Sequence, residues 1–183
     1  MFYDPNLFPF TPILERNWQR VYEEYLGVRP YLFDWVEKEL YGDGTWKVLI
    51  LYTMPEGKPV EENIQRCPFT ASLVHDHVPN HGLVGFSVLH PQTRLEPHHG
   101  HDGWEFLRMH LALKVPPGEC ALKVEGEIQP WHTGKVMVFD DQALHEAWNL
   151  TAEERVVLLF DFLSDKRQRG PTREPQRSAV GQS

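Results

Sequence analysis

Hydrophobic positions between residues 11 and 27 recur every three or four residues, which is the spacing of one face of an α-helix. They are Leu14, Trp18, Val21, Tyr22, Tyr25 and Leu26. Thr11 can cap this helix with Pro12 at its first position, and Gly27 is suited to end it. A second short helix is predicted from Tyr31 to Tyr41. The chain from about residue 11 to about residue 41 is therefore expected to be helical.

The pattern changes to short apolar runs after the break at Gly42–Gly44. Trp46–Tyr52 predicts a buried strand, and helical pieces are expected on either side of Pro68. From residue 82 to about residue 163, apolar runs separated by proline and glycine indicate a β core, either a barrel or a sandwich. Its predicted strands are Leu83–Leu89, Trp104–Val115, Ala121–Val124, Lys135–Phe139 and Arg155–Phe162.

The size and composition of the chain favour one domain. A chain of 183 residues with 41% hydrophobic content can bury a single core, which we assign to residues 1–163. Residues 164–183 carry Arg, Pro, Gly, Ser and Gln with little to bury, so this tail is predicted to be disordered. The fold class is therefore expected to be mainly β with N-terminal helices.

The charge of the chain argues against a nucleic-acid partner. Its net charge is -8, whereas binding to phosphates requires clustered Lys and Arg. No stretch approaches the roughly 18 apolar residues of a membrane span, and the N-terminus does not resemble a secretory signal. Two cysteines, Cys67 and Cys120, are too few for a disulfide framework. We expect a cytoplasmic protein whose partner is a small molecule or a peptide.

Ten histidines are many for a chain of this length, and three lie in the segment PHHGH, as His98, His99 and His101. Clustered imidazoles suit iron, zinc or copper, although a solvated polar loop would also account for them. Downstream, Arg108 and His110 fall on one face of a single predicted strand. The strand therefore directs a cation and an imidazole toward the same side.

A further histidine, His145, follows a turn and stands ten residues before Arg155. A strand–loop–strand return of that length can bring both into one barrel interior. Ferrous iron needs neutral imidazole ligands, and a dicarboxylate co-substrate needs a buried guanidinium, which Arg155 can supply. The alternative is that Arg155 is a surface residue beside Glu153 and Glu154.

The order and spacing of six sequence pieces resemble the aspartyl/asparaginyl β-hydroxylase family of 2-oxoglutarate-dependent oxygenases, from about Phe8 to Phe162. The pieces are FPF with LERNW, CPFT, GFSVLHP, PHHG, LRMHLAL and GKVMVFDDQALHEAWN. The resemblance implies a double-stranded β-helix, a jelly-roll or cupin-like barrel. It also implies Fe(II), 2-oxoglutarate and O2, which together hydroxylate an unactivated C–H bond of an amino acid or a peptidyl Asp/Asn-type residue.

Position by position, the resemblance implies roles for six residues. His98 and His145 resemble the two iron ligands, and Arg155 resembles the residue that holds the far carboxylate of 2-oxoglutarate. Ser87, Arg108 and His110 resemble further contacts to this co-substrate.

Three alternatives stay open at this point. In the more widespread two-His-one-carboxylate site an acid stands two places after the first histidine, where this chain has Gly100; Asp102 or water could take its place, or a halide could. A cupin-type cage could instead use His99, His101, Glu105 and His145. A non-catalytic binding module on the same barrel is the third possibility.

Overall fold

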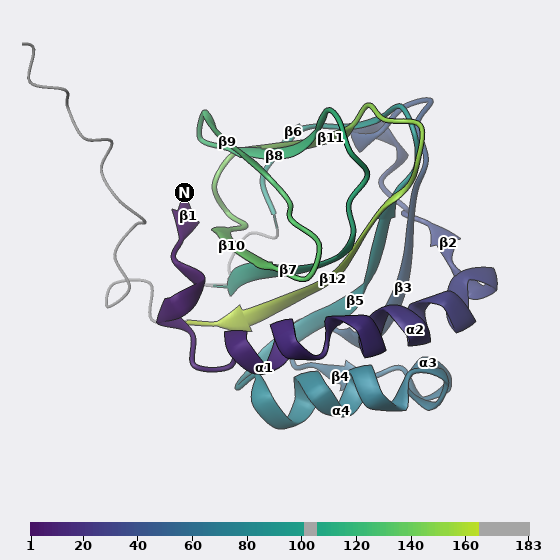
Figure 1. Cartoon of the computed structure of the whole chain (residues 1–183), viewed down its shortest axis with the longest axis vertical. Helices are drawn as coiled ribbons and strands as arrows, with labels where there is room; N and C mark the ends of the chain where they lie inside the picture. The colour runs from purple at the N-terminus through teal and green to yellow at the C-terminus, as the bar shows by residue number, and fades with distance from the viewer. Residues whose placement is uncertain (101–105, 165–183) are drawn as a thin grey trace, which may run out of the picture.

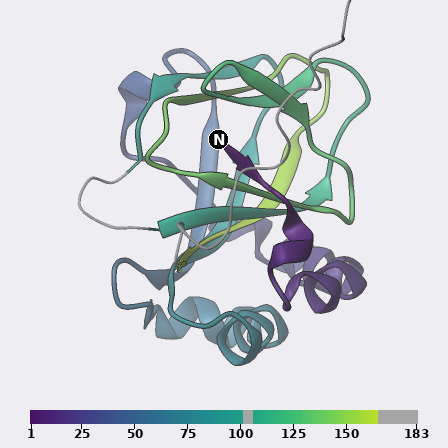
Figure 2. The same ribbon diagram turned by 90° about the vertical axis from the view of Figure 1, so that its left-hand side faces the viewer.

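Two β-sheets face each other across the interior of the protein, and helices cover the outer face of the larger sheet (Figure 1). The computed structural model describes residues 1–100 and 106–164. The tail for which disorder is predicted lies, apart from Ser164, outside these described residues. Figure 2 shows the two layers from the side.

All strand pairs in the two sheets are antiparallel. The larger sheet has the order β1 (Phe2–Tyr3), β10 (Val136–Asp140), β7 (Phe106–Lys114), β12 (Arg155–Leu163), β5 (His81–Leu89), β3 (Trp46–Thr53) and β2 (Phe33–Asp34), and β4 (Lys58–Pro59) pairs with β3. The smaller sheet has the order β6 (Thr93–His98), β11 (His145–Asn149), β8 (Cys120–Val124) and β9 (Glu127–Pro130). The mainly β, jelly-roll architecture predicted from the sequence is confirmed.

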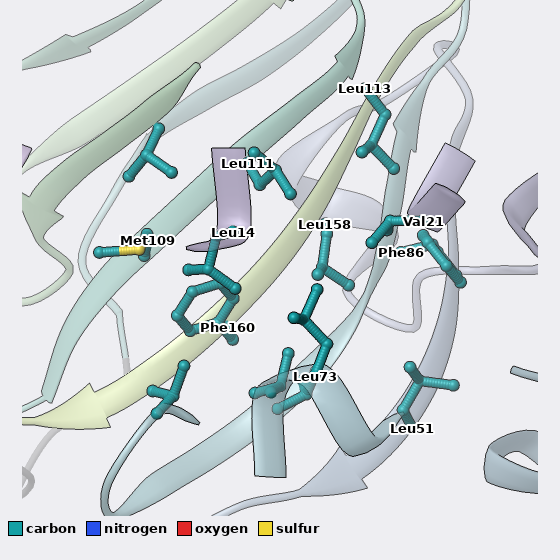
Figure 3. Packing of buried hydrophobic residues seen from close by; sticks show 14 of the residues in the cluster. Leu14, Val21, Leu51, Leu73, Phe86, Met109, Leu111, Leu113, Leu158 and Phe160 are labelled. Carbon is teal, nitrogen blue, oxygen red and sulfur yellow. The ribbon is translucent and has the colours of Figure 1, made fainter. Parts of the chain in front are cut away.

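Alternation along the central strands divides the interior into two hydrophobic clusters. In β12, Leu158 and Phe160 point toward the helices and pack with Leu14, as Figure 3 shows. Val157 and Leu159 belong to the other cluster, which lies between the two sheets. The odd-numbered positions of β12, among them Arg155, therefore face the smaller sheet, where the predicted site residues lie.

Four α-helices lie in the described residues, and none has the length and apolar character needed to cross a bilayer. They are α1 (Thr11–Arg16), α2 (Trp18–Val28), α3 (Glu61–Arg66) and α4 (Pro68–His77). Three 3₁₀ turns accompany them: η1 (Pro5–Leu7), η2 (Arg29–Tyr31) and η3 (Lys38–Leu40). The helical pieces predicted on either side of Pro68 are present as α3 and α4.

The predicted helix between residues 11 and 27 is wrong in its details. The side-chain amide of Asn17 donates to the carbonyl of Ile13 at 2.7 Å, in place of the backbone N–H that a continuous helix would use, and the helix divides there. The hydroxyl of Thr11 donates to Pro5 rather than capping, and Gly27 lies inside α2. Leu26, predicted to be on the apolar stripe, is 46% exposed.

The helix predicted from Tyr31 to Tyr41 does not form. Phe33 and Asp34 instead pair with β3 as a short edge strand, and the ring of Trp35 packs against that of Trp46 at 5.1 Å between centroids. Tertiary pairing with the sheet edge overrides the weak local helical pattern.

The predicted strands match β3, β5, β7, β8, β10 and β12 to within a few residues. Trp104 and Glu105, at the start of the predicted Trp104–Val115 strand, lie outside the described residues. The larger sheet also includes β1 and β3, which precede the range of about 82 to 163 expected for the β core. Strands β6, β9 and β11 were not expected, and β6 and β11 are the two that carry His98 and His145.

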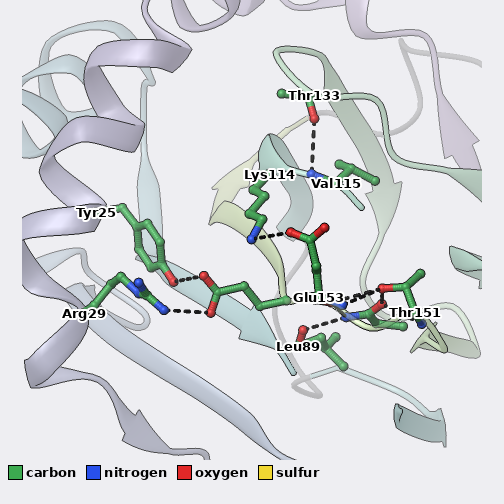
Figure 4. A network of polar contacts seen from close by, with 10 residues as sticks. Tyr25, Arg29, Leu89, Lys114, Val115, Thr133, Thr151 and Glu153 are labelled. Atoms are coloured by element: carbon green, nitrogen blue, oxygen red, sulfur yellow. Dashed lines mark hydrogen bonds and ion pairs between the residues drawn. The ribbon is translucent and has the colours of Figure 1, made fainter. Parts of the chain in front are cut away.

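The turn between β11 and β12 is held by the buried side chain of Asn149. Its amide nitrogen donates to the carbonyls of Leu89 at 2.9 Å and Glu153 at 2.8 Å, and its oxygen accepts from the hydroxyl of Thr151 at 2.7 Å. Figure 4 shows this network beside the ion pair of Lys114 with Glu153. The network fixes the return that connects His145 to Arg155.

Asn149→Ala is expected to lower the free energy of unfolding by about 2 to 4 kcal/mol, because it leaves several buried polar groups without partners. Chemical denaturation with a spectroscopic probe measures this change. Asn6→Ala, at an exposed side chain, is the matched control and should cost under about 0.5 kcal/mol. Equal losses in the two variants would contradict this role of Asn149.

Candidate functional site

His98 and His145 lie opposite each other on β6 and β11, with ring centroids 4.2 Å apart. In each ring the Nδ1–H donates to a backbone carbonyl two residues earlier, at 2.7 Å to Glu96 and 2.8 Å to Ala143. Since Nδ1 of each ring is used in this way, Nε2 is the nitrogen that is left to bind a metal. The pKa of His145 is lowered to about 3, mainly by burial and secondly by the nearby His98 ring. The ring of His145 is therefore neutral near pH 7.

The carboxylate of Asp141 lies beside this pair, with Oδ1 3.7 Å from Nε2 of His145. It also occupies the space that a side chain at position 100 would need, since a Cβ on Gly100 would lie 1.7 Å from Oδ2 of Asp141. The backbone N–H of Gly100 donates to the carbonyl of Asp141 at 2.8 Å. A glycine at position 100 is therefore what allows Asp141 to approach the histidines.

Arg108 on β7 holds this carboxylate in place. Its Nε and Nη2 donate to the two oxygens of Asp161 at 2.7 and 2.8 Å, and its Nη1 lies 2.5 Å from Oδ1 of Asp141. Burial alone would lower the pKa of Arg108, but the two carboxylates outweigh it and raise that pKa above its ordinary value. All three guanidinium nitrogens thus face protein carboxylates.

Arg155 on β12 has a different environment, and its side chain is even more deeply buried than that of Arg108. Its Nη1 donates weakly to the carbonyl of Ser87 at 3.4 Å, its guanidinium carbon lies 4.6 Å from the centre of the Trp131 ring, and its Nε has no hydrogen-bond partner among the described residues. Burial lowers the pKa of Arg155 to about 10, so it remains charged at neutral pH. Glu154 binds Tyr25 and Arg29, and Glu153 binds Lys114, so neither is the partner of Arg155 (Figure 4).

Two further hydrogen-bond donors share the inner face of the larger sheet with Arg155. The hydroxyl of Ser87 accepts from Nε1 of Trp46 at 3.0 Å, which leaves its own hydrogen to be donated. Nδ1 of His110 accepts from Nε1 of Trp131 at 3.2 Å, so the neutral ring carries its hydrogen on Nε2, which has no partner among residues 1–100 and 106–164. Burial, with the nearby Arg155 cation, holds the pKa of His110 well below its ordinary value.

A buried cation and two spare donors in one interior make an anion site. The His98–His145 pair is connected to it through Phe139, whose ring contacts His145 at 5.4 Å and His110 at 5.2 Å between centroids. Within the described chain, no group of three or more His, Cys, Asp or Glu side chains is arranged to hold a metal ion. The described residues thus place a two-histidine pair next to an anion site.

A cavity of about 220 Å³ opens from this pair toward the surface. His98, Gly100, Arg108 and Ser87 are among the residues that line it, together with the exposed His99. The rest of its wall comes mainly from apolar residues of β3, β5 and the segment between β2 and β3. A molecule in this cavity would contact His98 and Ser87, whereas His110, His145 and Arg155 do not line it.

A sequence model of the aspartyl/asparaginyl β-hydroxylase family matches residues 15–165. The chain belongs to this family. The resemblance inferred from six short motifs is thereby confirmed over most of the chain.

Two proteins with similar sequences are named for different activities. The human aspartyl/asparaginyl β-hydroxylase is 31% identical over 155 residues, which is 81% of this chain and 20% of that protein. An ornithine lipid ester-linked acyl 2-hydroxylase from Rhizobium tropici is 32% identical over 186 residues, which is 96% of this chain and 62% of that protein. The chain thus spans a fifth to under two thirds of the length of these relatives.

Solved structures with a similar fold agree with the two-sheet architecture. An oxidoreductase of the 2-oxoglutarate-Fe(II) oxygenase family from Burkholderia pseudomallei has a TM-score of 0.56 at 15% identity, with 83% of this chain and 80% of that chain covered. A Pseudomonas putida prolyl-4-hydroxylase has a TM-score of 0.54 at 12% identity, with 81% and 86% covered. At these identities the likeness supports the fold.

The structure of this family member brings together all six residues singled out from the sequence. Arg108 is the one whose contacts differ from the expected contact to a co-substrate, because its guanidinium is bound by Asp141 and Asp161. His101, Asp102 and Glu105, which belong to the alternative metal sites, lie outside the described residues.

The contacts that three further side chains make in the site were not predicted from the sequence. The approach of Asp141 to Gly100 depends on two loops that are distant in sequence. Trp131 and Trp46 hold His110 and Ser87 through their indole N–H groups. The only sequence signal for these roles is that a buried Trp needs an acceptor for its N–H.

Arg155→Met is expected to leave the free energy of unfolding unchanged or to raise it by about 1 to 3 kcal/mol in buffer free of carboxylates and phosphate, because it removes a buried charge without a carboxylate partner. The matched control is Arg108→Met, which strands two carboxylates and should cost about 3 to 5 kcal/mol. Denaturant titrations of the two variants give the comparison. A large loss of stability in Arg155→Met would show that Arg155 already has a protein partner.

Proposed function

We propose that this chain is an Fe(II)- and 2-oxoglutarate-dependent dioxygenase that hydroxylates an unactivated C–H bond. The observation that carries the proposal is the anion site formed by Arg155, Ser87 and His110 beside the His98–His145 pair. The balanced reaction would be R–H with O2 and 2-oxoglutarate giving R–OH, succinate and CO2. Family membership supports the same reaction class.

The two histidines fit the ligand requirements of ferrous iron. In each histidine, the bond from Nδ1 to a backbone carbonyl fixes the orientation of the ring and leaves Nε2 for the metal. Metal-binding histidines commonly have this arrangement. Bound there, iron would supply the oxygen chemistry, and the protein would supply position and charge. The carboxylate of Asp141, held by Arg108, lies near Nε2 of His145 and would add a negative charge beside a metal bound there.

The anion site fits the far carboxylate of 2-oxoglutarate. Arg155 can form a charged, two-pronged pair with a carboxylate, and Ser87 and His110 each have a hydrogen left to donate. Trp46 and Trp131 hold these two donors in place before any ligand arrives. A bound dianion would thus compensate the buried guanidinium.

The cupin-type cage of His99, His101, Glu105 and His145 is supported less well. The Nδ1–H of His99 donates to the carbonyl of Gln142 at 2.9 Å, and this exposed residue lines the cavity. A cupin-type cage would also give no role to Arg155 and His110. A small-molecule or peptide substrate and a cytoplasmic location remain predictions from the sequence.

His145→Ala is expected to weaken metal binding by at least about 100-fold, because it removes one of two protein ligands. Calorimetry with Zn(II) or, without oxygen, Fe(II) measures the affinity. His132→Ala, at an exposed imidazole, is the control and should bind like the parent. Unchanged affinity in His145→Ala would refute the assigned ligand.

Arg155→Met is expected to raise the 2-oxoglutarate concentration needed for half-maximal succinate formation by about 30- to 1000-fold, because the far carboxylate loses its charged partner. The uncoupled reaction without substrate provides the assay. The control is 2-oxovalerate, a co-substrate analogue that lacks the far carboxylate. The concentration of 2-oxovalerate needed for half-maximal turnover should be the same in the parent and the variant. An equal effect on both 2-oxo acids would count against a carboxylate contact.

A further inference from the structure

Two further histidines lie close together on the other side of the larger sheet. His75 is in the last turn of α4, and His81 is the first residue of β5. Nδ1 of His75 is 3.4 Å from Nε2 of His81. The helices cover one face of the larger sheet, and the smaller sheet, which carries His98 and His145, lies across the other face (Figure 1). The chain therefore has two separate pairs of imidazoles.

An irregularity in the strand pairing turns His81 toward the helices. Val84 pairs with Phe160. The next pair is His81 with Phe162, so β5 has one residue more than β12 in this interval. Paired residues point to the same side of a sheet, and Phe160 and Phe162 both belong to the hydrophobic cluster under the helices. Without this bulge, regular alternation would direct position 81 toward the smaller sheet, as it does Ser87.

The rings of both histidines pack on Tyr52. A shift in the pairing of β3 with β5 between Ile50 and Tyr52 brings this tyrosine to the same side of the sheet. Its ring is nearly parallel to that of His75 at 6.2 Å and meets that of His81 edge-on at 4.7 Å between centroids. Gly57 also packs against His81, since a Cβ at position 57 would lie 2.8 Å from Nδ1 of that ring. These contacts fix the ring of His81 with Nε2 toward His75.

The distance between the two facing nitrogens suits a shared metal ion. A Zn(II) ion held about 2.0 to 2.1 Å from each of two nitrogens, at a tetrahedral angle, sets the nitrogens about 3.3 to 3.4 Å apart. The observed 3.4 Å between His75 and His81 agrees with this spacing and is long for a direct hydrogen bond. Imidazoles suit zinc, nickel and copper, whereas magnesium and calcium take oxygen ligands.

The surroundings of this pair favour a cation. His75 lies at the carboxyl end of α4, where the backbone carbonyls carry a partial negative charge. The pKa of Tyr52 is raised, mainly by burial and further by the carboxylates of Asp76 and Glu61. The phenol is therefore neutral at pH 7 and serves as a packing surface, while the two carboxylates add negative charge nearby. Because His75 is exposed, water can complete the coordination of an ion.

We propose that His75 and His81 form a second metal site, which binds a divalent ion of the zinc, nickel or copper class through two imidazoles and water. The site does not depend on the proposed function, because it lies on the opposite face of the larger sheet from the His98–His145 pair. An ion there would join the end of α4 to the start of β5 and stabilise the packing of this helix on the sheet.

The number of Zn(II) ions bound by the full chain tests the second site. Calorimetry should find two ions in the parent, one in His75→Ala, one in His145→Ala, and none when both changes are combined. His81→Phe keeps an aromatic ring against Tyr52 and should lose the same ion as His75→Ala. An unchanged count in His75→Ala and His81→Phe overturns the second site. An unchanged count in His145→Ala would instead contradict the ligand assigned under the proposed function and leave this site standing.

His77→Ala is the matched control. His77 is also an exposed residue of α4, but it stands two positions after His75, which directs its side chain to the other side of the helix. In the His145→Ala background, affinity for Zn(II) should fall at least about tenfold in His75→Ala and stay unchanged in His77→Ala. Mg(II) should not compete. Equal affinities in the two variants would refute a site built on His75.

Two further measurements locate the ion in the His145→Ala protein. Saturating Zn(II) should raise the midpoint of thermal unfolding, because the ion binds the folded chain, and adding His75→Ala should abolish this rise. Paramagnetic Ni(II) should broaden the nuclear magnetic resonance signals of the Tyr52 ring before those of Phe139, which lies beside position 145. Broadening of Phe139 first, or a rise in the midpoint that persists in the double variant, would overturn the proposal.

Discussion

The burial of Arg155 is the constraint on which the interior depends. A guanidinium inside a protein is costly unless an anion accompanies it. The same sheet shows how the chain neutralises such a charge, because Arg108 lies on the neighbouring strand with two carboxylates around it. Among the residues that the structure describes, Arg155 receives only an aromatic face and a long contact to a carbonyl. The difference between these two arginines marks the place where the fold leaves room for a charged ligand.

The strands of the larger sheet could be predicted from the sequence because their apolar character does not depend on distant partners. β3, β5, β7 and β12 are buried on both faces and appear as long hydrophobic runs. β6 could not be predicted in this way, since only Thr93 and Leu95 of its six residues are fully buried. The helix prediction between residues 11 and 41 was wrong for two reasons: the side chain of Asn17 divides the first helix, and the tertiary pairing of Phe33 with Val48 replaces the second.

The residues of the candidate site also fall into two groups, those that could be predicted from the sequence and those that could not. His98, His145 and Arg155 could be singled out because histidine and arginine in a β context are chemically conspicuous and fall in recognisable motifs. The supporting contacts could not, since Arg108 with Asp161, Trp131 with His110 and Gly100 with Asp141 each join residues that are far apart in the chain. Such contacts follow from strand order and register, which motif spacing does not reveal.

The opposed positions of His98 and His145 have a consequence for the folding of the smaller sheet. The two residues are direct partners in the β6–β11 pair, so a slip of one residue would turn one ring away from the other. A metal ion held by both rings would bind only the correctly aligned pair, and its binding free energy would add to the stability of that alignment. A metal bound as proposed would therefore stabilise the pairing of β6 with β11 in addition to any part it takes in the reaction.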